Sequence, residues 1–87
     1  KEARRWQDLV MLHKAGKIGR PDCQVPVSCD FNGQHICNWI ADFVYLDMLT
    51  GKVVYEDVKS EVTRKLPVYR IKRKLVKALH GIEILET

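Results

Sequence analysis

The chain has 87 residues, 46% of them hydrophobic and 30% charged, which is the balance of one folded globular domain and excludes a disordered tail. Fifteen Lys and Arg against eleven Asp and Glu give a net charge of +4, which suits a polyanionic partner but also fits a merely soluble basic surface. No apolar run reaches the roughly 18 residues of a membrane span, no signal peptide is recognisable, and three cysteines without a Cys-x-x-Cys pair predict reduced thiols in the cytoplasm.

The first expected element is an amphipathic helix over residues 2–15, with Gly16 suited to end it. Its inward positions recur at helical spacing, and they are Ala3, Trp6, Leu9, Val10 and His13. Glu2 lies one turn before Trp6, on the edge of this face, so it can point toward a sheet; equally, it can simply favour the positive end of the helix dipole. Because the chain opens inside this helix, we expect further residues upstream of Lys1.

After a loop over residues 16–24, two strands joined by a tight turn are expected. Residues 25–31 alternate between apolar and polar side chains, which is typical of a half-exposed strand toward the edge of a sheet. Asn32-Gly33 is a strong two-residue turn signal, and it leads into a long strand that ends at residue 46.

Asp42 lies within an apolar row of this long strand. Successive side chains point to opposite faces, so one face carries Asn38, Ile40, Asp42, Val44 and Leu46, and the other carries Trp39, Ala41, Phe43 and Tyr45. Because both faces are mostly apolar, we expect a central strand covered on both sides. A carboxylate in such a place requires a partner.

A turn over residues 47–52 and a strand over residues 53–59 complete a hairpin. If the turn is centred between Leu49 and Thr50, positions that sum to 99 lie opposite each other, which pairs Asp42 with Asp57. Two like charges so placed repel unless a cation lies between them. Lys59 points the same way as Asp57, whereas Glu56 points to the opposite face. A register slip of one residue would separate the two acids. The alternative for Asp57 and Lys59 is an exposed ion pair on a surface strand.

A polar link over residues 60–66 precedes a second helix over residues 67–80, which Gly81 ends. Its expected apolar arc consists of Val68, Ile71, Leu75, Ala78 and Leu79. A basic stripe on the other side consists of Arg70, Arg73, Lys74 and Lys77. With no acidic residue between them, these cations suit DNA phosphates, although a solvated helix face would look the same.

Lys72 falls inside the apolar arc, where a lysine either extends its ammonium to water or reaches a buried acid beneath the helix. Residues 81–86 form the last expected strand. A strand, a helix and a strand imply a right-handed crossover and parallel pairing. The predicted order is therefore αβββαβ, an α/β fold with a mixed sheet flanked by helices.

An acid on one strand, a hairpin and then acid-any-Lys on the next strand resembles the PD-(D/E)xK nuclease superfamily. The matching residues are Ala41-Asp42 and Asp57-Val58-Lys59. The rest of the sequence is similar to a phage-encoded family of endonucleases and Holliday-junction-resolvase-like proteins, and this similarity covers nearly the whole chain. The segments that carry it are KEARR, IADFVY, YEDVKS, YRIKRKL and HGIEI. Ala41 stands where the superfamily has Pro, at a position that donates no ligand.

The resemblance implies a restriction-endonuclease-like core formed by residues 1–87 and a metal site. Its ligands would be the carboxylates of Glu2, Asp42 and Asp57 with the backbone carbonyl of Val58. Because every ligand is an oxygen, Mg²⁺ is the expected ion, with Mn²⁺ as a substitute. Lys59 would either deprotonate the attacking water or position it and stabilise the transition-state charge, and neighbouring acids favour the second role. Lys72 would support this site.

The expected function is a Mg²⁺-dependent DNA endonuclease of phage or prophage origin, acting in the cytoplasm of a bacterial host on duplex or branched DNA. Two-fold junction substrates would suit a homodimer. The alternative from another class is a non-catalytic, basic nucleic-acid-binding module that holds DNA through the basic stripe. A structural or protein-interaction domain is a third class, which the clustered acids argue against.

Overall fold

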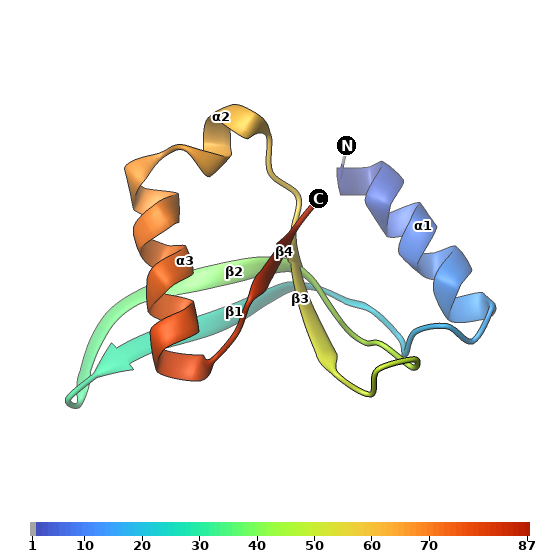
Figure 1. Cartoon of the computed structure of the whole chain (residues 1–87), viewed down its shortest axis with the longest axis horizontal. Coiled ribbons are helices and arrows are strands. Elements are labelled where there is room, and N and C mark those ends of the chain that lie inside the picture. Colours follow the sequence, from blue (N-terminus) through green and yellow to red (C-terminus); the bar gives the residue numbers. More distant parts are fainter. Residues whose placement is uncertain (1) are drawn as a thin grey trace.

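The computed structural model describes residues 2–87, so Lys1 of the first helix motif lies outside the described residues. The elements in chain order are α1 (Glu2–Lys14), β1 (Asp22–Phe31), β2 (Gln34–Leu46), β3 (Val53–Asp57), α2 (Glu61–Arg64), α3 (Pro67–His80) and β4 (Ile84–Glu86). This order confirms the predicted αβββαβ arrangement, with the short helix α2 added (Figure 1). No helix within these residues is long and apolar enough to cross a lipid bilayer.

The four strands form one mixed sheet in the order β1-β2-β3-β4. β1 and β2 are antiparallel and joined at Asn32-Gly33, where both residues have positive φ, as the turn signal predicts. β2 and β3 are antiparallel, and their paired residues, from Phe43 opposite Glu56 to Leu46 opposite Val53, all sum to 99. The predicted register is therefore confirmed. β4 pairs with β3 in parallel, as expected for a strand, a helix and a strand.

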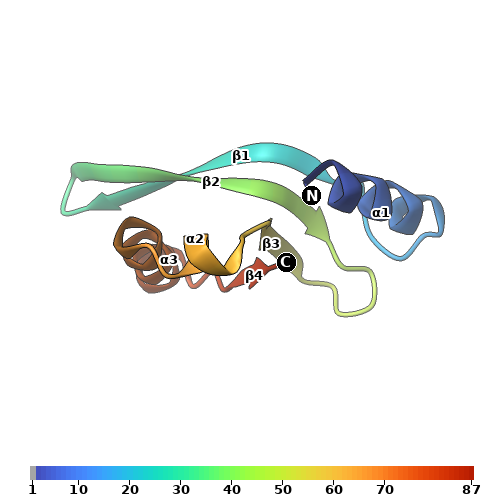
Figure 2. The same ribbon diagram turned by 90° about the horizontal axis from the view of Figure 1, so that it is seen from above.

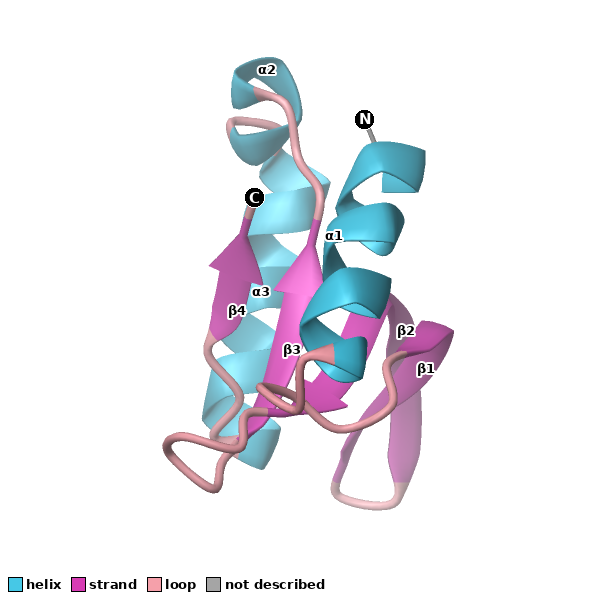
Figure 3. Cartoon of the chain, turned by 90° about the vertical axis from the view of Figure 1, so that its right-hand side faces the viewer, coloured by secondary structure: helices cyan, strands magenta, loops and turns pink. Residues whose placement is uncertain are grey.

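The two long helices lie on opposite faces of the β3–β4 part of the sheet, with α1 in front and α3 behind in Figure 3. Seen from above, the long β1–β2 hairpin extends beyond β3 and β4, with α3 beneath it and α1 at the other end (Figure 2). Leu9 and Ile18 pack against β2 in one hydrophobic cluster, and Val76 packs against β1 and β2 in another. The sheet therefore separates two small cores.

β2 is central in the sheet, but only one of its rows is buried. Trp39 and Ala41 join the cluster beneath α3, whereas Phe43 and Tyr45 join the cluster beneath α1. A long strand twists along its length, so one row can face different neighbours at its two ends. The prediction of coverage on both sides is wrong, because on the other row Ile40 is 52% and Leu46 38% exposed. Two helices are too few to cover both faces of so long a strand.

The buried side of α3 agrees with the predicted arc at Leu75 and Leu79, which pack against the cluster of Val76, and differs from it elsewhere. Tyr69 and Val76 are its buried residues, while Val68 and Ile71 are 67% and 59% exposed and Ala78 is exposed. The helix is rotated so that an aromatic side chain replaces smaller aliphatic ones, since Tyr69 buries a larger apolar surface and finds a hydrogen-bond partner for its hydroxyl. Gly81 ends the helix in the left-handed conformation, as predicted.

The link over residues 60–66 was predicted to be irregular, but it contains α2. Ser60 is the N-cap of this helix, and its hydroxyl accepts a hydrogen bond from the Thr63 backbone N–H at 3.1 Å. A serine three residues before a threonine is a weak helix signal, which is why the sequence pattern did not reveal this single turn.

A buried ion pair attaches α1 to β3. The guanidinium of Arg5 donates two hydrogen bonds to the carboxylate of Glu56, at 2.7 and 2.8 Å, and the Tyr45 hydroxyl donates a third at 2.9 Å. Glu56 is fully buried, so this carboxylate depends on its two partners. Burial and the bond to Glu56 raise the pKa of Tyr45 to about 12. These contacts with α1 confirm the prediction that Glu56 points to the face of the sheet opposite Asp57.

We expect Arg5→Met to destabilise the fold by about 3–5 kcal/mol, because it leaves a fully buried carboxylate without its charged partner. Glu56→Gln should cost less, because the partly exposed Arg5 can turn to water. Urea denaturation of both variants measures this difference. Arg4→Met, at the exposed neighbouring arginine, is the control and should be nearly neutral. Equal small losses for Arg5→Met and Arg4→Met would contradict this account of Arg5.

Candidate active site

Asp42 of β2 and Asp57 of β3 lie opposite each other in the register that pairs Phe43 with Glu56. Asp57 is fully buried, and Asp42 is half-buried. The Val58 backbone N–H donates a hydrogen bond of 2.8 Å to Oδ2 of Asp42, which ties this carboxylate to the end of β3. The predicted pair of acids is therefore present, on neighbouring strands.

Asp57 has partners for only one of its two oxygens. The Trp39 indole donates a hydrogen bond to Oδ2 at 3.1 Å, and the Lys59 ammonium lies 3.5 Å from the same oxygen. Oδ1 is buried and has no hydrogen-bond partner among the described residues. Burial, followed by the neighbouring carboxylate of Asp42, raises the pKa of Asp57 to about 6, against the opposing effects of Trp39 and Lys59. The local environment thus disfavours the charged form of this acid.

Lys59 is held on the face of Asp57, as the strand parity predicts. Its ammonium lies 5.1 Å from the centre of the Tyr69 ring, so it is placed between a carboxylate and an aromatic face. The Tyr69 hydroxyl donates to Glu86 at 2.8 Å, which fixes the ring. These contacts hold the ammonium as a positioned cation beside the acids.

Glu2 reaches the same region from α1, although its side chain is exposed. The amide of Gln24 donates hydrogen bonds to Oε1 of Glu2 at 2.8 Å and to Oδ1 of Asp42 at 3.4 Å. Partial desolvation and then the charge of Asp42 raise the pKa of Glu2. Within residues 2–87, no three His, Cys, Asp or Glu side chains meet closely enough to form a metal-binding group. Glu2 therefore approaches Asp42 but does not complete a three-carboxylate cluster.

Two side chains of this site, Trp39 and Gln24, carry no signal of their role in the sequence. The strand pattern predicts Trp39 as a core residue, and nothing in it indicates that the indole N–H donates a hydrogen bond to Asp57. Gln24 reads as a loop residue, yet it lies in β1 with a φ of 53°. Long-range contacts of this kind depend on how strands twist, and no local signal encodes them.

Lys72 is half-buried on α3 and lines a hollow beside Lys59. The other residues that line the hollow are Asn38, Trp39, Ile40, Leu66, Val68 and Tyr69. No ion pair between Lys72 and an acid occurs in the described part of the chain. Lys72 thus lies on the side of the site that its place in the helix predicts, without pairing with Asp57.

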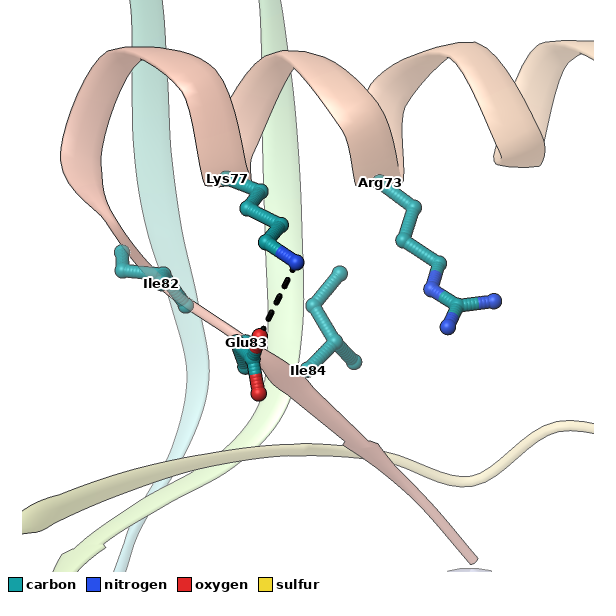
Figure 4. A pocket seen from close by; sticks show the side chains of 5 residues that line it. All are labelled: Arg73, Lys77, Ile82, Glu83 and Ile84. Atoms are coloured by element: carbon teal, nitrogen blue, oxygen red, sulfur yellow. Dashed lines mark ion pairs between the residues drawn. The ribbon is translucent and has the colours of Figure 1, made fainter.

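The basic stripe on α3 is partly neutralised by two acids that follow the helix, Glu83 before β4 and Glu86 in β4. Arg73 lies 3.5 Å from Glu86, and Lys77 lies 3.0 Å from Glu83. Figure 4 shows Arg73 and Lys77 projecting from the helix toward the strand, around a hollow formed with Ile82 and Ile84. The acids follow the helix in sequence, and the parallel crossover brings them back beneath it.

Arg70 and Lys74 are the other two members of the stripe. Both are exposed, and neither forms an ion pair with any residue that the structure describes. They keep their full charge for an outside partner, whereas Arg73 and Lys77 must first leave their acids. Such exposed pairs contribute at most about 1 kcal/mol, so a phosphate group can displace them.

The chain has no match among family models, curated proteins or solved structures. Any functional assignment therefore depends on the side chains of this protein and on its sequence pattern.

The raised pKa of Asp57 predicts how apoprotein stability changes with pH. Because the fold favours the protonated acid, this contribution is fully present below the usual pKa of 3.8 and is lost as pH rises through about 6. In EDTA, Asp57→Asn should therefore be more stable than wild type above pH 6, by up to about 3 kcal/mol, and the difference should vanish below pH 4. Urea titrations at each pH measure this difference in the free energy of unfolding. A difference that does not change with pH would contradict the raised pKa of Asp57.

Proposed function

We propose that this protein is a metal-dependent DNA endonuclease of the PD-(D/E)xK type. The observation that carries the proposal is the buried Oδ1 of Asp57, which has no partner among the described residues and belongs to a carboxylate that faces a second acid. Proteins rarely leave a buried polar atom unsatisfied, and such atoms indicate a bound ion, a bound water or a functional role. A cation between the two acids would satisfy this oxygen and relieve their repulsion.

The residues at this position fit a hard divalent cation. Asp42 and Asp57 supply carboxylate oxygens, and the backbone carbonyl of Val58 is the third protein ligand that we propose. Glu2, which shares the Gln24 amide with Asp42, is the further ligand that we propose, bound directly or through water. Mg²⁺ keeps several water ligands and needs only one or two carboxylates, so a three-carboxylate cluster is not required. Mn²⁺ accepts the same oxygen donors. The metal would activate a water and polarise the phosphate.

The remaining side chains have roles in holding DNA and stabilising charge. Lys59, fixed by Asp57 and Tyr69, lies where it can orient the attacking water and stabilise negative charge that develops on the phosphate. Lys72 lines the adjacent hollow and provides a second cation for the substrate backbone. Arg70 and Lys74 extend this positive surface along α3, with Arg73 and Lys77 beside them.

The element order and the mixed sheet support a restriction-endonuclease-like core as the finer description of this fold. By the same resemblance we propose a phage or prophage origin, action in the bacterial cytoplasm, and a homodimer for two-fold junction substrates. A basic nucleic-acid-binding module without hydrolytic activity is the second candidate, because Arg70 and Lys74 are free cations that need no metal to contact DNA.

A nicking assay on supercoiled, flap and four-way-junction DNA tests the activity. We expect cleavage only with Mg²⁺ or Mn²⁺, and at least a 100-fold loss for Asp57→Asn and Lys59→Ala, because each removes a group required for charge stabilisation. Asp8→Asn, at an exposed acid of α1, is the control and should cleave normally. Cleavage that is absent with every metal, while the protein still binds DNA, would favour the binding module.

The basic stripe makes a separate prediction about binding. Replacing Arg70 and Lys74 together with Ala should weaken DNA binding and reduce the slope of log K against log salt by about 2, because two phosphate contacts are lost. The matched double replacement of Arg73 and Lys77 should reduce the slope less, because these cations are paired with Glu86 and Glu83. Fluorescence anisotropy over a salt series with Ca²⁺ measures both. A larger effect from Arg73 and Lys77 would contradict the proposed binding surface.

A further inference from the structure

We propose that Gln24 is a positioning residue of the acidic site, which holds the Glu2 carboxylate beside Asp42. This inference rests on the proposed function and adds a residue to it. Gln24 comes from β1, so the site would be built by four segments of the chain: α1, β1, β2 and β3.

The first support is the contact geometry. A single amide nitrogen of Gln24 donates to carboxylates on two different elements, at 2.8 Å to Glu2 and 3.4 Å to Asp42. Glu2 and Asp42 carry like charges and share one hydrogen-bond donor, so their carboxylates lie close enough to repel each other. A neutral donor shared by two acids reduces this repulsion without adding a cation that would compete with a metal. Among the described residues, Gln24 is the only side chain that donates a hydrogen bond to Glu2.

The second support is the backbone of Gln24. Its φ of 53° lies in the left-handed region, which residues with a Cβ rarely adopt. The other such residue, Asn32, lies in a hairpin turn and is of a type that tolerates this conformation. Gln24 instead lies within a strand. Unfavourable backbone conformations persist where the surrounding structure requires them, and they cluster at functional sites.

Together these observations give Gln24 a defined task. The Arg5–Glu56 ion pair holds the first turn of α1 against β3, whereas the Gln24 amide is what holds the exposed Glu2 side chain beside Asp42. Without this amide, the Glu2 carboxylate would turn to water. With it, the Glu2 carboxylate is already at the edge of the Asp42–Asp57 pair before a cation arrives. Loss of residues that orient ligands typically weakens metal binding 10- to 100-fold.

Metal affinity and stability separate this role from a merely structural one. We expect Gln24→Met and Gln24→Gly to weaken Mn²⁺ binding by about tenfold or more, measured by electron paramagnetic resonance without DNA. The glycine variant should nevertheless be the more stable of the two, because glycine suits a positive φ. Gln7→Met, at an exposed glutamine of α1, is the control and should bind Mn²⁺ like wild type. Wild-type affinity in either Gln24 variant would overturn the proposal.

A double-mutant cycle in EDTA tests the contact without any metal. Gln24→Met and Glu2→Gln, singly and together, should show a coupling of at least about twofold in the unfolding equilibrium constant. Additive effects would overturn the tether. If wild type binds no Mn²⁺, the proposed function fails, whereas additive effects with normal Mn²⁺ binding by wild type reject only the role of Gln24.

Discussion

The unresolved repulsion between Asp42 and Asp57 is the constraint around which this small fold is arranged. Two carboxylates face each other across neighbouring strands, and one of them is fully buried. The protein offsets this cost only in part. It supplies an indole N–H, a backbone N–H and one ammonium, and still leaves one carboxylate oxygen without a partner among the described residues. An arrangement that served stability alone would replace one acid with an apolar residue or complete the hydrogen bonding.

The neighbouring residue Glu56 shows that the same strand can satisfy a buried acid completely. Glu56 and Asp57 are adjacent in β3, both are fully buried, and they point to opposite faces. Glu56 accepts two hydrogen bonds from the Arg5 guanidinium and one from the Tyr45 hydroxyl, so both of its oxygens are paired. Asp57 has a lysine at 3.5 Å and one free oxygen. Since both acids are buried on the same strand, the difference lies in their pairing: Glu56 is fully paired, whereas Asp57 keeps one oxygen without a partner among the described residues.

The sequence predicted most of the framework because strand parity and turn chemistry are local. Asn32-Gly33 determined the first hairpin, and a turn centred between Leu49 and Thr50 correctly paired the second. The failures came from packing between distant elements. The rotation of α3 depends on where Tyr69 fits, the exposure of Ile40 depends on how few helices cover the sheet, and the pairing of Lys77 with Glu83 depends on the crossover. Gln24 escaped prediction because a left-handed glutamine in a strand has no sequence signature.

The structural acid and the candidate site are coupled through α1. This helix carries Arg5, which pairs with Glu56 on one face of β3, and Glu2, which approaches Asp42 next to the other buried acid. The two residues are less than one helical turn apart, so a shift of the helix that breaks the buried ion pair also moves the Glu2 carboxylate. The Arg5–Glu56 ion pair therefore also determines the position of α1, in addition to any contribution it makes to stability. It fixes the helix against the sheet at the end where Glu2 shares the Gln24 amide with Asp42.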